Sequence, residues 1–253
     1  MRTRSATPVP SIGRLALTAG ALASVAGVLL IWLARASIHR PIYVSELGAR
    51  GMPTAPLFVT ALLLVAAGAA LIAIAGIHPR LHLPLIGTAS VGGTIAISSV
   101  FFVVASQVSC TAGCPVPLVG AGSTFQDLVH TTAAVLGFVA GCAAMLQVGL
   151  VGWRMRIARF SIAACCAVAV ITIIGGMLSI FRTATDVGGV LEFVGTTVAI
   201  GWLACYGLWL AWRPRVPEVA PGIAPEVVSA RIQEPAAERV AGYERPDAIS
   251  ASS

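Results

Sequence analysis

Six apolar runs, each of about 20 residues or more, follow one another along the chain and limit its possible folds more than any other feature. Soluble domains carry about 25% charged residues, whereas 57% of these 253 residues are hydrophobic and only 10% are charged. The runs are apolar all round, as in membrane helices, and lack the alternation typical of membrane barrels. We therefore predict an all-α polytopic membrane protein, a bundle of six transmembrane helices. The predicted spans are Leu15–Ala34, Ala55–Ile77, Leu83–Gln107, Leu128–Trp153, Phe160–Phe181 and Val187–Trp212.

The arginines near the span ends predict the orientation, because basic residues collect on the cytoplasmic side. One side holds four of them, Arg35, Arg40, Arg50 and Arg182, and the other side holds nine. Both termini are therefore expected in the cytoplasm. We predict a cytoplasmic segment at residues 1–14, a membrane domain at 15–212 and a cytoplasmic tail at 213–253. The tail is rich in Pro, Glu, Ala and Arg, which predicts disorder.

Polar residues gather in the predicted outward loops and at the outward ends of the helices. Around three helix N-termini, such a group could hold an anionic headgroup or a metal, or it could form a salt-bridged lid. We call it the outer polar cup. It comprises Arg35, His39, Arg40, Glu46, Arg50, Asp127, His130, Arg182, Asp186 and Glu192. The ligand-binding candidates within it are Glu46, Arg50, Asp127, His130, Arg182 and Glu192.

Asp127 and His130 are candidates for chemistry because residues three apart share a helix face. A carboxylate beside an imidazole can orient a general base or complete a metal site. The alternative is structural: Thr124 and Asp127 match a T-x-x-D capping box, with His130 reaching the membrane interface.

Glu192 is the third candidate for a catalytic or binding role. It lies about one turn into the last span, where an ionised group is costly without a partner or a watery cavity. The candidate partners are Arg182, Arg35 and His130.

Two cysteines, Cys110 and Cys114, lie in a predicted outward loop, where an oxidising compartment preserves disulfides. We expect them to form a disulfide. The alternative, a pair of metal thiolates, needs two further ligands. Neither a metal nor a cofactor is expected.

Two loop segments carry a resemblance to a known family. The segment Tyr43-Val-Ser-Glu-Leu-Gly-Ala-Arg-Gly-Met-Pro53, and Cys110-Thr-Ala-Gly-Cys-Pro115 followed by His130, resemble the bacterial and archaeal "domain of unknown function 998" (DUF998) membrane family over roughly residues 15–212. A looser similarity, through Ser-Glu-Leu-Gly…Pro, links the chain to the six-span Frag/DRAM/Sfk group. Where relatives carry Gly-x-x-Gln-Arg, this chain has Gly189-Val-Leu-Glu192-Phe193. The resemblance implies the architecture and a bacterial plasma membrane, and it supplies no established activity.

Three functions are compatible with these features. We expect a non-catalytic cell-envelope protein whose outer polar cup binds a lipid headgroup, a membrane-protein partner or a second copy of the chain. One alternative is a lipid-modifying enzyme that uses the acidic residues and His130 of the cup. The other, a transporter, is disfavoured because the middles of the spans lack charge. Nucleic acid is not an expected partner, since the arginines behind the net charge of +6 lie at helix ends and in the tail.

Overall fold

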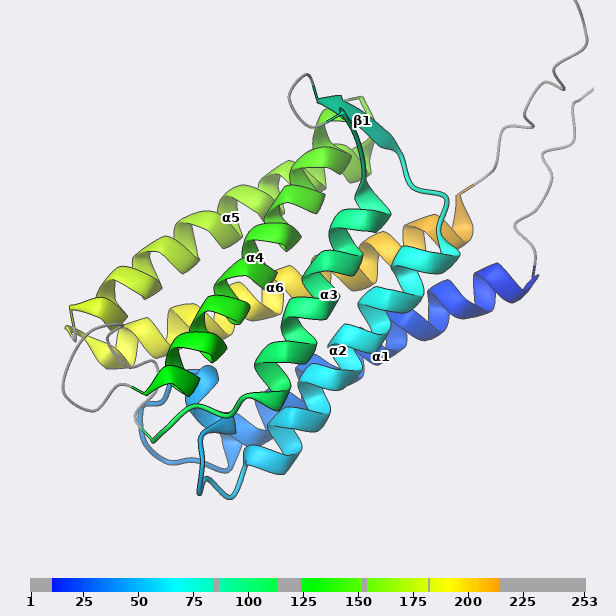
Figure 1. The fold of residues 1–253 in the computed structure, drawn as a ribbon. Helices are drawn as coiled ribbons and strands as arrows, with labels where there is room; N and C mark the ends of the chain where they lie inside the picture. The colour runs from blue at the N-terminus through cyan, green and yellow to red at the C-terminus, as the bar shows by residue number, and fades with distance from the viewer. Residues whose placement is uncertain (1–10, 84–86, 113–123, 152–153, 182, 214–253) are drawn as a thin grey trace, which may run out of the picture. The chain divides into compact units, whose positions relative to one another are not determined.

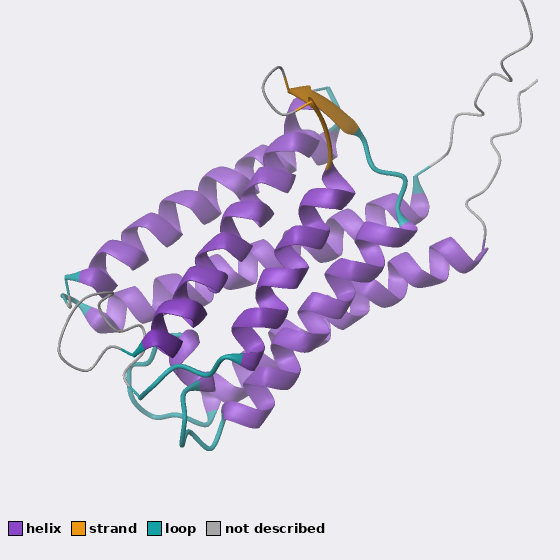
Figure 2. Ribbon diagram, viewed as in Figure 1, coloured by secondary structure: helices purple, strands orange, loops and turns teal. Residues whose placement is uncertain are grey.

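The computed structural model describes residues 11–83, 87–112, 124–151, 154–181 and 183–213. Helices dominate this part of the chain (Figures 1 and 2). The described residues form six α-helices: α1 (Ser11–Ala36), α2 (Ala55–Ala75), α3 (Val91–Gln107), α4 (Phe125–Val151), α5 (Arg156–Ile180) and α6 (Thr185–Trp212). The all-α prediction is confirmed, and the predicted tail and most of the predicted N-terminal segment lie outside the described residues.

The start of the third helix was predicted wrongly. The first residues of the predicted span lie instead in a two-stranded antiparallel hairpin, β1 (Arg80–Leu83) and β2 (Gly87–Ser90). The helix begins only at Val91, because Ser90 Oγ accepts a hydrogen bond from the N–H of Gly93 (3.0 Å) and caps it. Hydropathy alone shows no boundary there.

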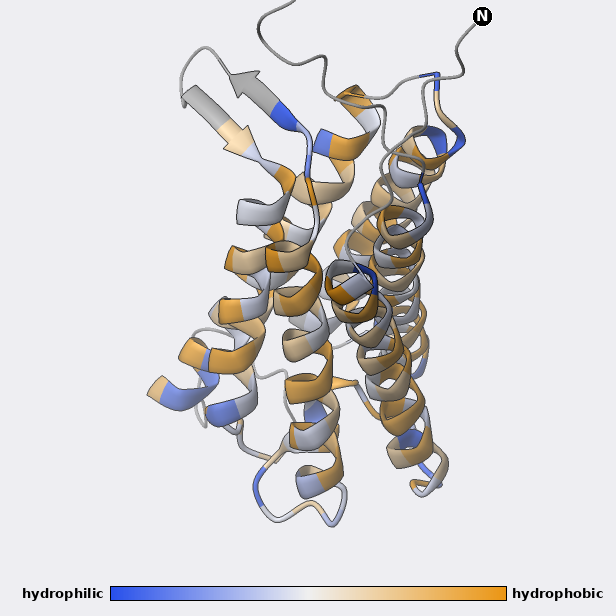
Figure 3. Ribbon diagram, turned by 90° about the vertical axis from the view of Figure 1, so that its right-hand side faces the viewer, coloured by the Kyte–Doolittle hydropathy of each residue, from blue (hydrophilic) through white to orange (hydrophobic). Residues whose placement is uncertain are grey.

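Length distinguishes α3 from the other helices. Within the described residues, α1, α2, α4, α5 and α6 are long and apolar enough to cross a membrane, whereas α3 has 17 residues. At about 1.5 Å per residue, α3 is somewhat shorter than a hydrocarbon core about 30 Å thick. Figure 3 shows hydrophobic residues along most of the helices and hydrophilic residues mainly near their ends. The several long apolar helices indicate a multi-pass membrane protein.

The helices form a closed ring. Each contacts the next helix in sequence, and α1 also packs along α6. The closest approach joins α1 to α2 at Gly20 and Gly68: a Cβ on Gly68 would stand 2.5 Å from the carbonyl oxygen of Gly20. Glycines therefore bring these two backbones together. Buried residues fill the ring in two clusters, one around Met145, Trp202 and Tyr206 and one around Phe58 and Phe193.

Candidate functional site

The loop between α1 and α2, residues 37–54, folds over one end of the ring. It contains a short 3-10 helix, η1 (Ser45–Gly48), which falls within the Tyr43–Pro53 motif. Its buried apolar side chains include Ile42, Val44, Leu47 and Ala49. Of these four, all but Ala49 pack in the cluster that contains Phe58 and Phe193. The loop is thus part of the core.

Helix α6 holds this loop through Gly188, Gly189 and the carboxylate of Glu192. A Cβ on Gly188 would stand 2.6 Å from the hydroxyl oxygen of Tyr43. A Cβ on Gly189 would stand 2.5 Å from the carbonyl oxygen of Ile42, so the backbones touch there. Glu192 Oε2 accepts a hydrogen bond from the N–H of Val44 (2.9 Å). The N–H and hydroxyl of Ser45 lie beside the same carboxylate, although Ser45 Oγ, which is buried, makes no hydrogen bond of standard geometry. Glu192 therefore supplies an acceptor at the N-terminus of η1, a role that capping side chains usually fill.

The partners predicted for Glu192 differ from those in the structure. Within the described residues Glu192 forms no ion pair; the one ion pair found there joins Arg40 to Glu46. Arg35 donates from Nη1 to the carbonyl oxygen of Ile38 (2.7 Å) and lies over the Phe193 ring. Arg182 lies outside the described residues. Among the described residues, the N–H of Val44 in the α1–α2 loop is a partner of Glu192, and pairing with Arg182 stays a prediction.

Asp127 has the structural role that the capping box predicts. Its N–H donates to Thr124 Oγ1 (3.2 Å), and its Oδ2 accepts from the N–H of Thr124 (2.8 Å). Its Oδ1 also accepts from the N–H of Thr111 (2.7 Å), which fastens the segment after α3 to the start of α4. Asp127 is 3% exposed. Both of its carboxylate oxygens accept hydrogen bonds from Thr111 or Thr124, so Asp127 connects these two segments.

Cys110 ties the segment after α3 to the α1–α2 loop. Its carbonyl oxygen accepts from the N–H of Arg50 (2.9 Å), and its buried thiol donates to the carbonyl oxygen of Ser45 (3.6 Å). Among the described residues no disulfide is present, and Cys110 is a free thiol. Its predicted partner Cys114 lies outside the described residues, and the free thiol of Cys110 does not support the predicted Cys110–Cys114 disulfide.

The remaining residues of the outer polar cup are divided among separate contacts. Glu46, which is buried, accepts from Arg40 Nη2, and this hydrogen bond and charge raise the pKa of Arg40 above its ordinary value. Arg50 and Asp186 have exposed side chains. Among the described residues these side chains therefore make separate contacts, and a shared ligand site for the predicted set stays a prediction.

His130 faces inward from α4 and is 4% exposed. Its Nδ1 lies 2.9 Å from the carbonyl oxygen of Ala105 and 2.8 Å from that of Val108. Carbonyl oxygens only accept, so Nδ1 carries a proton. In the neutral ring Nε2 is therefore an acceptor.

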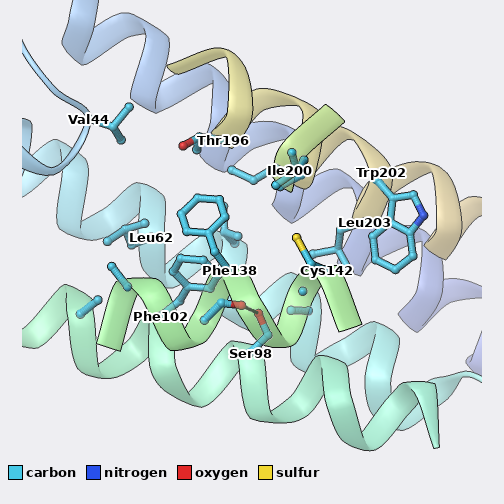
Figure 4. Close-up of a pocket in the computed structure, with 18 of the residues that line it drawn as sticks. Val44, Leu62, Ser98, Phe102, Phe138, Cys142, Thr196, Ile200, Trp202 and Leu203 are labelled. Carbon is cyan, nitrogen blue, oxygen red and sulfur yellow. Dashed lines mark hydrogen bonds between the residues drawn. The ribbon is translucent and has the colours of Figure 1, made fainter. Parts of the chain in front are cut away.

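A cavity of about 90 Å³ runs inside the ring beneath the α1–α2 loop (Figure 4). Its lining on α4 extends from His130 to Met145, roughly 22 Å at about 1.5 Å per residue. In Figure 4, Val44 lies at one end and Trp202 at the other. The apolar side chains that line it include Leu62, Phe102, Phe138, Cys142, Ile200 and Leu203.

The polar side chains of the cavity come mainly from the end near the α1–α2 loop. Ser45, His130, Glu192 and Thr196 line it there, and Ser98, further along, donates to the carbonyl oxygen of Gly137 (2.8 Å). Sequence reasoning missed Ser45 and Thr196. Ser45 belongs to the Ser-Glu-Leu-Gly motif, and Thr196 follows Glu192 by four residues on one helix face. These two signals could have indicated them.

The contacts at this end do not form a catalytic arrangement within the described residues. A serine nucleophile needs a base in hydrogen-bond reach, and the base needs an orienting group. Here Ser45 Oγ makes no hydrogen bond of standard geometry with any described residue, so His130 Nε2 does not contact it as a base. The described residues contain no group of three or more His, Cys, Asp and Glu side chains that could hold a metal.

A second polar contact lies at the other end of the ring. His78 Nδ1 is 3.1 Å from the hydroxyl of Tyr206, and its Nε2 is 2.9 Å from the carbonyl oxygen of Ile72. Tyr206 stacks between Trp202 and Trp209 on α6. Burial lowers the pKa of His78, which keeps the ring neutral.

Comparison with known proteins gives one match. The family model described as "Protein of unknown function (DUF998)" covers residues 18–209. Neither a curated protein nor a solved structure matches the chain. The similarity to the Frag/DRAM/Sfk group is not confirmed.

Proposed function

The chain belongs to the DUF998 family, and from that premise we propose that it is a non-catalytic protein of a bacterial plasma membrane that binds a lipid inside its helix ring. The hydrocarbon chain lies in the cavity. The polar group of the lipid lies at the end lined by Ser45, His130 and Glu192.

One observation carries this proposal: the cavity is long, narrow and apolar, and its polar side chains gather toward one end. The lining extends for roughly 22 Å along α4, a length that matches an extended hydrocarbon chain. Ligand sites are mainly apolar with a few polar groups that fix orientation. A single-chain lipid has the same division of apolar and polar parts.

Two further observations support binding over catalysis or transport. The enzyme alternative requires Asp127 and Glu46. Asp127 already accepts hydrogen bonds from two threonines, and Glu46 accepts one from Arg40. The described residues that line the middle of the cavity carry no charge, whereas a coupled transporter usually holds charges near the midplane.

A cavity-filling substitution tests the proposal. Gly141 lines the cavity, and a Cβ there would meet its nearest atom, Ser98 Oγ, at 3.8 Å. Gly141→Leu should therefore project into the cavity without a backbone clash. Gly176→Leu is the matched control, because a Cβ at this exposed site on α5 meets no atom within 4 Å.

The measurement is the lipid that stays bound after purification in mild detergent, seen by intact mass spectrometry. The parent and Gly176→Leu should retain a lipid, and Gly141→Leu should lose most of it. Equal retention by the two variants, a parent without lipid, or a co-purifying protein in place of lipid would count against the proposal.

A further inference from the structure

The polar end of the cavity offers hydrogen-bond acceptors and no positive charge among the described residues. Glu192 Oε2 accepts a hydrogen bond from the loop backbone, and His130 Nε2 accepts when the ring is neutral, because Nδ1 is protonated. None of the described arginines lines the cavity. Ser45 adds a buried hydroxyl that makes no hydrogen bond of standard geometry.

We infer that the bound lipid has one hydrocarbon chain and a polar end that donates hydrogen bonds and carries no negative charge. A long-chain alcohol or ammonium is the simplest example. This inference rests on the proposed function, because it names the class of lipid that the same site would take. It replaces the anionic headgroup that the sequence suggested for the outer polar cup.

The physical reason is the charge balance at a site away from water. A sulfate or phosphate there would lie near the Glu192 carboxylate, with no described cation in the cavity wall to offset the cost of losing water. An ammonium group could instead donate to both Glu192 and His130 Nε2, and a hydroxyl could donate to one of them. These two side chains come from α6 and α4, so an ammonium there would bridge two helices of the ring.

The cavity also contains a fluorescent reporter. Trp202 lines it, is 2% exposed, and donates from Nε1 to Ser161 Oγ (2.8 Å). Bromine atoms on a lipid chain in the cavity would therefore quench Trp202. The Gly141→Leu variant provides the background, because quenching of the exposed tryptophans persists when the cavity is filled.

The experiment compares three probes with the same dibrominated octadecyl chain: the alcohol, the ammonium and the sulfate. In the parent, the alcohol and the ammonium should quench beyond the Gly141→Leu background. The sulfate should need at least about a tenfold higher mole fraction in the micelle, because like charges at a buried site repel strongly. In Glu192→Gln, the mole fractions of sulfate and of alcohol needed for quenching should lie closer together, since the substitution removes the charge and keeps the shape.

The outcomes separate the inference from the proposed function. If the sulfate quenches as well as the alcohol, and Gly141→Leu still abolishes the effect, the charge preference is wrong and lipid binding stands. If none of the three probes quenches the parent more than Gly141→Leu, the proposed function itself fails. A Glu192→Gln protein that keeps the full difference would show that another group sets the preference, which also overturns the inference.

Discussion

Gly189→Ala is expected to destabilise the protein, although alanine is the better helix former. Alanine gains about 1 kcal/mol over glycine in a helix interior. Here, however, the new Cβ would stand 2.5 Å from the carbonyl oxygen of Ile42, a backbone atom that a rotamer change leaves in place. Moving the α1–α2 loop away costs about 1–3 kcal/mol as overpacking and weakens the hydrogen bond from Val44 to Glu192, worth about 1 kcal/mol. The net loss is about 1–3 kcal/mol.

Thermal unfolding in detergent measures this loss, with roughly 2–4 °C of apparent Tm per kcal/mol for a chain of this size. All samples need one scan rate, because such transitions are often irreversible. Gly201→Ala is the control, since it lies on the same helix and its Cβ would meet no atom within 4 Å. Its Tm should equal or slightly exceed that of the parent. If Gly189→Ala has the same Tm as Gly201→Ala, the loop does not pack on α6 as described.

Three other predictions concern the ends of the ring. Glu192→Gln keeps an oxygen for the N–H of Val44 and should melt close to the parent, whereas Glu192→Ala should lose about 1–3 kcal/mol; equal melting of the two variants would contradict the capping role. Because burial lowers the pKa of His78, the unfolded chain takes up the proton first, so stability should fall as pH drops below about 6.5; His78→Gln should flatten that fall, and an unchanged pH profile would refute it. The arginine asymmetry predicts that, in a cysteine-free background, a cysteine at Thr183 reacts with an impermeant thiol reagent on intact cells and one at Met155 does not; the reverse pattern would invert the topology.

Sequence reasoning succeeded where the physical cause is local. Apolar run length identified the helices, and a threonine three residues before an aspartate was enough to predict the Asp127 cap. It failed for the hairpin before α3, where an uninterrupted apolar run hid the cap at Ser90. It also failed for the partner of Glu192, because Val44 lies 148 residues away and contributes only a backbone N–H, which no side-chain pattern reveals.

The cavity was beyond sequence reasoning for a related reason. Its lining comes from α2 through α6 and from the α1–α2 loop, so it exists only after the ring has closed. The outer polar cup placed His130 and Glu192 correctly near one end of the bundle. It did not distinguish His130 and Glu192, which face inward, from Glu46 and Asp127. The carboxylates of Glu46 and Asp127 accept hydrogen bonds from Arg40 and Thr111 instead.

The attachment of an early loop to the last helix has a consequence for biosynthesis. The α1–α2 loop is made when less than a quarter of the chain has been translated, yet its contacts on α6 come from residues after position 187. During elongation, Ile42, Val44 and Leu47 have no complete site in which to bury their side chains. Contacts so distant in sequence form late and slowly. In a chain that stalls or ends before α6, the apolar residues of the α1–α2 loop therefore stay exposed. Exposed apolar residues promote misassembly and degradation.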